Sequence, residues 1–115
     1  MKISEQYNLK GKVAIITGAG DGIGRASALK LAQAGATVVC SDLDLEKAQE
    51  TVVMVKDLGA EGLAVKCNVT VEEDMKALVD ETVKEFGKVN ILVNNAGGGG
   101  GGKERGNSPC QSYRS

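Results

Sequence analysis

The chain has 115 residues, of which 42% are hydrophobic and 25% charged, and its formal net charge is −1. This length and composition fit one globular domain, and the near-zero net charge excludes the basic surface that binding to nucleic acid requires. The sequence has no histidine, no Cys-x-x-Cys pair, no apolar leader and no run of transmembrane length, so we expect a cytoplasmic protein without a metal site or a membrane contact.

An apolar run leads into a glycine-rich turn near the start of the chain. Residues 13–17 are apolar or β-branched and predict a buried parallel strand. Glycines follow at every second position from 18 to 24, and a helical pattern begins at about residue 22. This order is typical of a dinucleotide-binding βαβ unit, in which bare backbone and a helix N-terminus receive the pyrophosphate. We predict a pyrophosphate site here, contacted by the backbone N–H of Ile23; a flexible turn is the alternative interpretation.

The pattern of helix followed by strand repeats through the middle of the chain. Apolar residues at helical spacing predict helices over residues 22–34 and 45–58, and a glycine follows each of them. Short apolar runs predict strands over residues 37–41 and 63–67. This alternation predicts a parallel sheet with helices packed on its faces.

Asp42 stands at the carboxyl end of the second predicted strand. A carboxylate at this place can accept hydrogen bonds from the adenosine ribose hydroxyls of NAD, and it would repel the 2′-phosphate of NADP. Asp21, inside the glycine turn, adds negative charge, so we predict NAD as the cofactor, with Leu43 also in the site. An acid at a helix N-terminus is the alternative interpretation of Asp42. Arg25 is a signal in favour of NADP, and a helix arginine that faces solvent explains it equally well.

Two local signals follow the third predicted strand. Asn68 predicts an Asx turn, and Thr70 with Glu73 matches a capping box, which predicts Thr70 as the N-cap of a third helix. Apolar residues at helical spacing continue to residue 86 and predict a face packed on the core.

A second motif follows a fourth apolar run at residues 89–93. It reads Asn-Asn-Ala-Gly at 94–97, and glycine occupies every position from 97 to 102. Together with Thr-Gly-x-x-x-Gly-x-Gly at 17–24, this motif resembles the short-chain dehydrogenase/reductase family. The glycine run and its flanks resemble, within the family, the bacterial 7-alpha-hydroxysteroid dehydrogenases, over residues 1 to about 105. The resemblance implies an oxidoreductase that interconverts a hydroxyl and a ketone on a steroid of the 7-hydroxy bile acid type.

The resemblance also implies roles for residues at the ends of the third and fourth strands. Asn68 and Val69 would contact the adenine, and the Asn-Ala-Gly of the second motif would lie along the nicotinamide-side ribose. The predicted NAD-binding residues are Gly18, Gly20, Asp21, Gly22, Ile23, Gly24, Asp42, Leu43, Asn68, Val69, Asn95, Ala96 and Gly97.

The last ten residues, 106–115, have no apolar periodicity and hold the only proline, which predicts an unstructured tail. The catalytic Ser and the Tyr-x-x-x-Lys pair of the family are not found in the sequence, so no catalytic residue is assigned. We therefore expect a truncated reading frame that binds NAD without turnover, its steroid substrate belonging to a full-length parent. A catalytically silent NAD-binding or interaction fragment and a non-functional remnant are the alternatives.

The expected fold is α/β, a partial, Rossmann-type doubly wound parallel sheet in residues 1–105. Its four strands would take the order 3-2-1-4, with the first two helices on one face and the third on the other. Strand four would then form an apolar edge, through which the chain could associate with a second copy.

Overall fold

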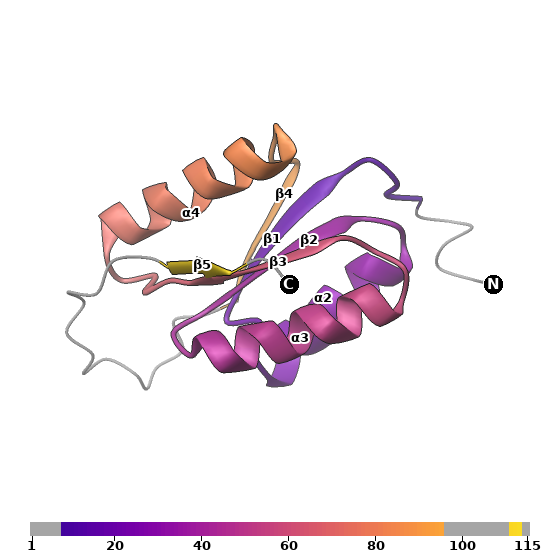
Figure 1. Ribbon diagram of the computed structural model, residues 1–115, viewed down its shortest axis with the longest axis horizontal. Helices are drawn as coiled ribbons and strands as arrows, with labels where there is room; N and C mark the ends of the chain where they lie inside the picture. Colours follow the sequence, from indigo (N-terminus) through magenta and orange to yellow (C-terminus); the bar gives the residue numbers. More distant parts are fainter. Residues whose placement is uncertain (1–7, 96–110, 114–115) are drawn as a thin grey trace.

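The computed structural model describes residues 8–95 and 111–113, and its strands form one sheet between layers of helices (Figure 1). The strands lie in the order β4-β1-β2-β3-β5, and β1 to β4 are parallel. The predicted order 3-2-1-4 of a Rossmann-type sheet is therefore confirmed. The elements are β1 (Val13–Thr17), α2 (Gly22–Gln33), β2 (Thr37–Asp42), α3 (Leu45–Asp57), β3 (Gly62–Lys66), α4 (Glu72–Phe86), β4 (Ile91–Asn94) and β5 (Gln111–Tyr113).

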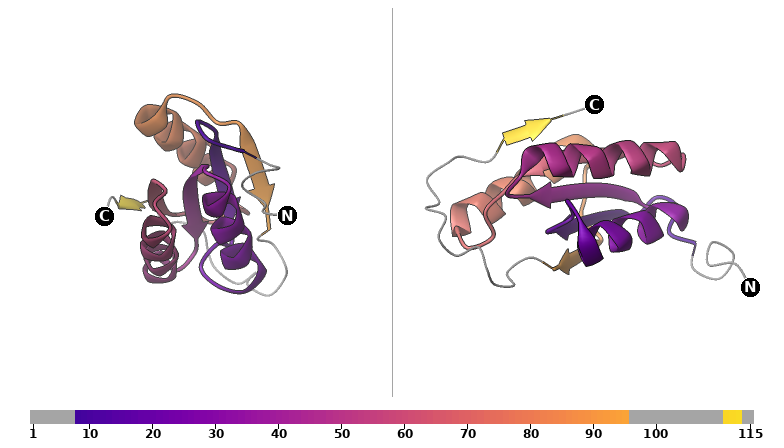
Figure 2. Two further views of the ribbon diagram at one scale, coloured as in Figure 1. Left: turned by 90° about the vertical axis from the view of Figure 1, so that its right-hand side faces the viewer. Right: turned by 90° about the horizontal axis from the view of Figure 1, so that it is seen from below.

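Helices α2 and α3 cover one face of the sheet, and α4 covers the other (Figures 1 and 2). Successive side chains of β1 point to opposite faces. Ala14 and Ile16 belong to the core shared with α2 and α3, whereas Val13 and Ile15 pack in the core that contains Leu78 of α4. Every residue of β1 is buried, as a central strand of a doubly covered sheet requires.

Strand β5 departs from the predicted unstructured tail. Residues 111–113 pair antiparallel with β3, and Ser112 stands opposite Val65. A strand edge offers unpaired N–H and C=O groups to any extended segment. This backbone pairing explains why a segment without apolar periodicity can add to the sheet. The rest of the tail and the glycine run at 97–102 lie outside the described residues.

The start of α4 differs from the predicted capping box. Val71 is the N-cap and makes no side-chain capping bond. Thr70 instead belongs to the predicted Asx turn, in which the Asn68 side-chain oxygen accepts hydrogen bonds from the backbone N–H and the hydroxyl of Thr70, at 2.9 and 2.6 Å. The Thr70 hydroxyl thus bonds to Asn68 and does not cap α4, because local side-chain hydrogen bonds compete with helix caps.

Strand β4 begins two residues later than predicted because Asn90 pairs with β1 through its side chain. The Asn90 side-chain oxygen accepts from the backbone N–H of Val13 at 2.8 Å, and the Asn90 N–H donates to the Val13 carbonyl at 2.8 Å.

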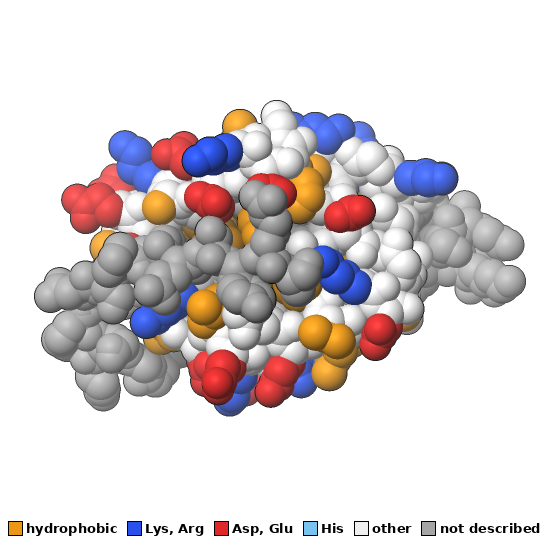
Figure 3. Space-filling view, in the orientation of Figure 1, with side chains coloured by type: hydrophobic (Ala, Val, Ile, Leu, Met, Phe, Trp, Pro, Cys, Tyr) orange, Lys and Arg blue, Asp and Glu red, His pale blue; other side chains and the backbone are white. Residues whose placement is uncertain are grey.

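Strand β4 is the outermost strand on its side of the sheet in the described part of the chain. Its Leu92 is 50% exposed, and Val79 and Val83 of α4 are 36% and 43% exposed. Figure 3 shows that hydrophobic side chains reach the surface over both α4 and α3, interspersed with charged ones. Within residues 8–95 and 111–113, none of the helices has the length and apolar character needed to cross a membrane.

Candidate cofactor site

Four strands end at the same edge of the sheet and bring the predicted site residues there. Thr17, the last residue of β1, pairs with Ser41 of β2 on one side and with Asn94 of β4 on the other. Asp42 pairs with Lys66 of β3. Ligands of parallel α/β sheets bind outside the carboxyl ends of the strands, where the order of strands reverses. Here that place lies between β1 and β4.

The glycine turn between β1 and α2 needs residues without side chains. Gly18 and Gly22 have φ angles of +66° and +58°, a region that other residues rarely adopt. A Cβ at Gly24 would overlap the Gly18 carbonyl oxygen and lie 3.0 Å from the side-chain nitrogen of Asn95. The turn therefore folds tightly against the first turn of α2, beside the end of β4.

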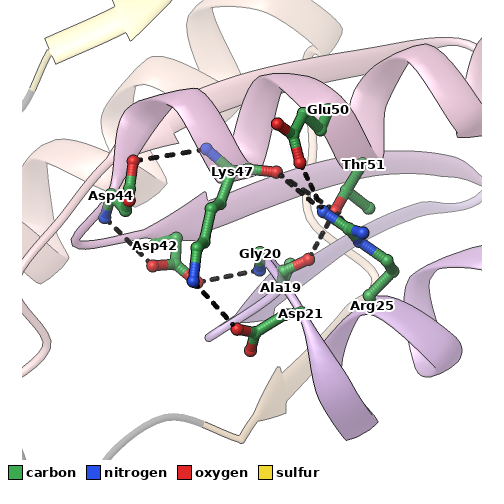
Figure 4. Close-up of polar contacts among 9 residues, drawn as sticks. All are labelled: Ala19, Gly20, Asp21, Arg25, Asp42, Asp44, Lys47, Glu50 and Thr51. Atoms are coloured by element: carbon green, nitrogen blue, oxygen red, sulfur yellow. Dashed lines mark hydrogen bonds and ion pairs between the residues drawn. The ribbon is translucent and has the colours of Figure 1, made fainter.

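Asp42 is fixed against this turn by two backbone groups (Figure 4). The Gly20 N–H donates to Asp42 Oδ2 at 2.8 Å, and the Asp44 N–H donates to Asp42 Oδ1 at 3.0 Å. A carboxylate has about four lone-pair positions, so each oxygen can accept a further hydrogen bond. A Cβ at Gly20 would stand 2.6 Å from Asp42 Oδ2, so this glycine is required for the close approach.

The alternative interpretation of Asp42, as a helix N-terminal acid, holds in part, because Asp42 accepts from the backbone N–H of Asp44 but does not cap α3. Asp44 is the N-cap of α3, and its side chain accepts from the Lys47 N–H at 3.3 Å. Asp42 instead ends β2 and connects it with the glycine turn.

Arg25 and Thr51 join the turn to α3, a connection that the sequence analysis missed. Arg25 Nε donates to the Thr51 hydroxyl at 2.9 Å, and its guanidinium forms an ion pair with Glu50 at 3.2 Å. The buried Thr51 hydroxyl in turn donates to the Ala19 carbonyl at 2.7 Å. The Arg25 side chain therefore does not face solvent, as the sequence analysis allowed: only 24% of it is exposed, and Thr51 and Glu50 of α3 hold it.

Lys47 is the second residue that the sequence analysis missed. Its Nζ donates to Asp21 Oδ2 at 3.2 Å, and both side chains are at least half exposed. The hydrogen bond with Asp21 raises the pKa of Lys47, and the charges of Asp21, Asp44 and Asp42 act in the same direction. No local pattern identifies Lys47 or Thr51, because their partners in the turn lie 26 and 32 positions away.

The predicted adenine side is formed by the turn after β3. Asn68 is buried, and its backbone N–H donates to Asp74 Oδ2 of α4 at 3.0 Å. Asp74 is 7% exposed, and its carboxylate holds the turn onto the helix. Val69 follows and is half-buried.

The predicted nicotinamide side is formed by the end of β4. The Thr17 hydroxyl accepts from the Asn95 N–H at 2.9 Å and donates to the Asn94 side-chain oxygen at 3.0 Å. Ile23, in the first turn of α2, is 75% exposed, and Leu43 is 41% exposed. Ala96 and Gly97 lie outside the described residues.

The residues present fit a dinucleotide. The turn that a Cβ would obstruct, the exposed start of α2 and a carboxylate held on the neighbouring strand occupy one edge of the sheet. The described ranges, 8–95 and 111–113, contain no group of three His, Cys, Asp or Glu residues that could hold a metal ion.

Comparison with known proteins places this geometry in a family. A 7alpha-hydroxysteroid dehydrogenase of Escherichia coli strain K12 is 48% identical over 94 residues, which are 82% of this chain and 37% of that enzyme. A cyclohexanol dehydrogenase of Acinetobacter sp. strain SE19 is 48% identical over 95 residues, 83% of this chain and 37% of the relative. The chain thus spans about 37% of the length of these relatives.

Solved structures show the same similarity. A hydroxysteroid dehydrogenase from Escherichia coli superposes with a TM-score of 0.79 at 45% identity, over 92% of this chain and 44% of that one. A short-chain type dehydrogenase/reductase from Mycobacterium marinum gives 0.78 at 34% identity, over 84% and 39%. The sequence profile of the family described as short chain dehydrogenase matches residues 12–112, so the match extends past residue 105, where the resemblance noted from the sequence ends. The chain therefore belongs to the short-chain dehydrogenase family.

Proposed function

We propose that the chain binds NAD and is the cofactor-binding part of an oxidoreductase that interconverts a hydroxyl and a ketone on a steroid. Proteins of this family typically use NAD or NADP. The steroid, of the 7-hydroxy bile acid type, is proposed from the Escherichia coli relative named a 7alpha-hydroxysteroid dehydrogenase. The chain spans only 37% of that relative. The steroid reaction of a complete enzyme is therefore part of this proposal.

The observation that carries the choice of NAD is the Asp42 carboxylate, held 2.8 Å from the Gly20 N–H. A ribose diol placed there donates its two hydroxyls to the carboxylate. A 2′-phosphate would instead meet the charges of Asp42 and of Asp21 in the turn. The bound cofactor supplies the hydride acceptor, and the chain's own residues bind and orient it.

Each part of the site has one task in this proposal. The backbone N–H groups of the glycine turn and of Ile23 receive the pyrophosphate at the start of α2. Asn68 and Val69 contact the adenine, and Leu43 lies beside the ribose. Asn95, together with Ala96 and Gly97, contacts the nicotinamide-side ribose.

A second candidate is a catalytically silent NAD-binding fragment that associates through β4. The half-exposed Leu92 on the outermost strand favours it. Only the second candidate requires the chain to associate with a second copy through β4, so analytical ultracentrifugation separates the two candidates.

Calorimetric titration with NAD tests the cofactor proposal. Asp42→Asn removes the charge and keeps one oxygen to accept from Gly20, and the Asp44 N–H that loses its partner is exposed to water, so the fold should survive. Hydrogen bonds to a charged group contribute about 1.5–3 kcal/mol, so NAD affinity should fall by about tenfold or more. Asp80→Asn makes the same change on the exposed surface of α4 and should leave affinity unchanged. Equal affinities for all three proteins would refute the proposal.

A further inference from the structure

Lys47 is a cation at the proposed ribose end of the site that the roles above do not use. It stands in the first turn of α3, and its Nζ lies 3.2 Å from Asp21 Oδ2. Its Cβ is 2.7 Å from the place that a Gly20 Cβ would take, on the side where Asp42 also lies. In Figure 4 the side chain runs from α3 past the Asp42 carboxylate to Asp21.

Three carboxylates act on this ammonium group, those of Asp21, Asp44 and Asp42. They favour its protonated form and raise the pKa of Lys47, so the group is charged at neutral pH. Lys47 therefore lowers the net negative charge at the place where Asp42 would receive a ribose.

We propose that Lys47 limits the discrimination between NAD and NADP by offsetting the repulsion that Asp42 and Asp21 exert on a ribose 2′-phosphate. The inference rests on the proposed function, since it needs a ribose at Asp42. Lysine carries a compact charge on a flexible stem, so its Nζ can leave Asp21 for a phosphate. Without Lys47 the site would select NAD more strictly.

The stability of the fold does not explain the contact between Lys47 and Asp21. The two side chains are 50% and 68% exposed, and exposed ion pairs contribute little to stability. The variant Lys47→Gln should therefore unfold at the same temperature as the wild-type chain, and its binding can be compared directly.

Two nucleotides that differ only at the ribose 2′ position isolate the effect. We would titrate the 115-residue chain with adenosine 5′-monophosphate and adenosine 2′,5′-bisphosphate in low salt. A phosphate adds about two negative charges, so Lys47→Gln should weaken the bisphosphate about two- to fivefold relative to the monophosphate. Lys47→Arg should preserve the ratio, and Lys76→Gln, on exposed α4 surface, should not change it. At about 1 M salt, screening should remove the difference.

The outcomes separate this inference from the proposed function. If the monophosphate binds and Lys47→Gln leaves the ratio at its wild-type value, the inference is wrong and the proposed function stands. A wild-type chain that binds the monophosphate but not the bisphosphate also contradicts the inference. If neither these nucleotides nor NAD bind, both the inference and the proposed function fail.

Discussion

Gly24 lies so close to Gly18 that a Cβ at position 24 would stand 2.6 Å from the Gly18 carbonyl carbon. Gly18 directly follows the last residue of β1, and Gly24 lies in the first turn of α2. The contact brings the start of the helix against the end of the strand, and with it the N–H groups proposed to receive the pyrophosphate.

Gly24→Ala should destabilise the chain although the position is helical. Helix propensity alone predicts a gain of about 1 kcal/mol for this change. The overlap with backbone atoms opposes it, and overpacking of this kind costs about 1–3 kcal/mol. Urea unfolding followed by circular dichroism measures the sign. A more stable variant would mean that strand and helix are not in contact.

Thr51→Val should cost about 1–3 kcal/mol, because the buried hydroxyl that serves the Ala19 carbonyl and Arg25 is lost. Thr82→Val is the matched control. Its hydroxyl is equally buried but donates to the Leu78 carbonyl within α4. In the variant the Leu78 carbonyl still accepts the backbone hydrogen bond of the helix. Urea midpoints should fall clearly for the first variant and little for the second. Equal losses would show that the hydroxyl of Thr51 does not support the turn.

Asp74→Ala should loosen the predicted adenine side. The change removes the acceptor of the Asn68 N–H and leaves that donor buried, at a cost of about 1–3 kcal/mol. Hydrogen exchange at the Asn68 amide should become faster, whereas Asp80→Ala on the same helix should not affect it. Unchanged protection at Asn68 in the Asp74 variant would contradict this role.

The order of the sheet and its layers were predictable because they follow from local periods in the sequence. Apolar runs that end at a turn marked the strands, and the spacing of residues such as Ala28 and Ala32 marked a helix face. The capping box failed at Thr70, because a local rule cannot show that Asn68 takes the hydroxyl. Asp42 ends β2, as expected from the sequence, whereas its contact with Gly20 was not predicted and its role in binding remains a prediction.

The supporting contacts of the site could not be predicted from sequence periods. Thr51 and Lys47 reach the glycine turn from another helix, across 32 and 26 positions. Asp74 reads as an ordinary acid in the first turn of a helix, and only the packed turn after β3 shows that it accepts from Asn68.

Stability should fall at high pH because of Cys40. Burial raises the pKa of the Cys40 thiol from 9.0 to about 12, with a smaller opposing effect of Arg25. The unfolded chain therefore releases this proton first, so the contribution is complete below pH 9 and is lost as pH rises toward 12. The loss is about 1.4 kcal/mol per pH unit.

Urea unfolding between about pH 8 and 10.5 measures how the free energy of unfolding changes with pH. The variant Cys40→Ala shows the part of this change that the other titratable groups cause. The wild-type chain should lose stability more steeply than the variant above the ordinary thiol pKa. Parallel slopes would contradict the buried, neutral thiol. At pH 8, alkylation of Cys40 should require unfolding, which peptide mass spectrometry can show.

Backbone chemical shifts of the ¹⁵N-labelled chain during titration with NAD test the central claim most directly. If the turn receives the pyrophosphate while Asp42 binds the ribose, the largest changes should occur at the amides of Gly20, Ile23 and Asp42. The amide of Asp80, on the exposed surface of α4, should not move. Changes confined to α4, or none at Gly20 and Asp42 at saturating NAD, would contradict the account.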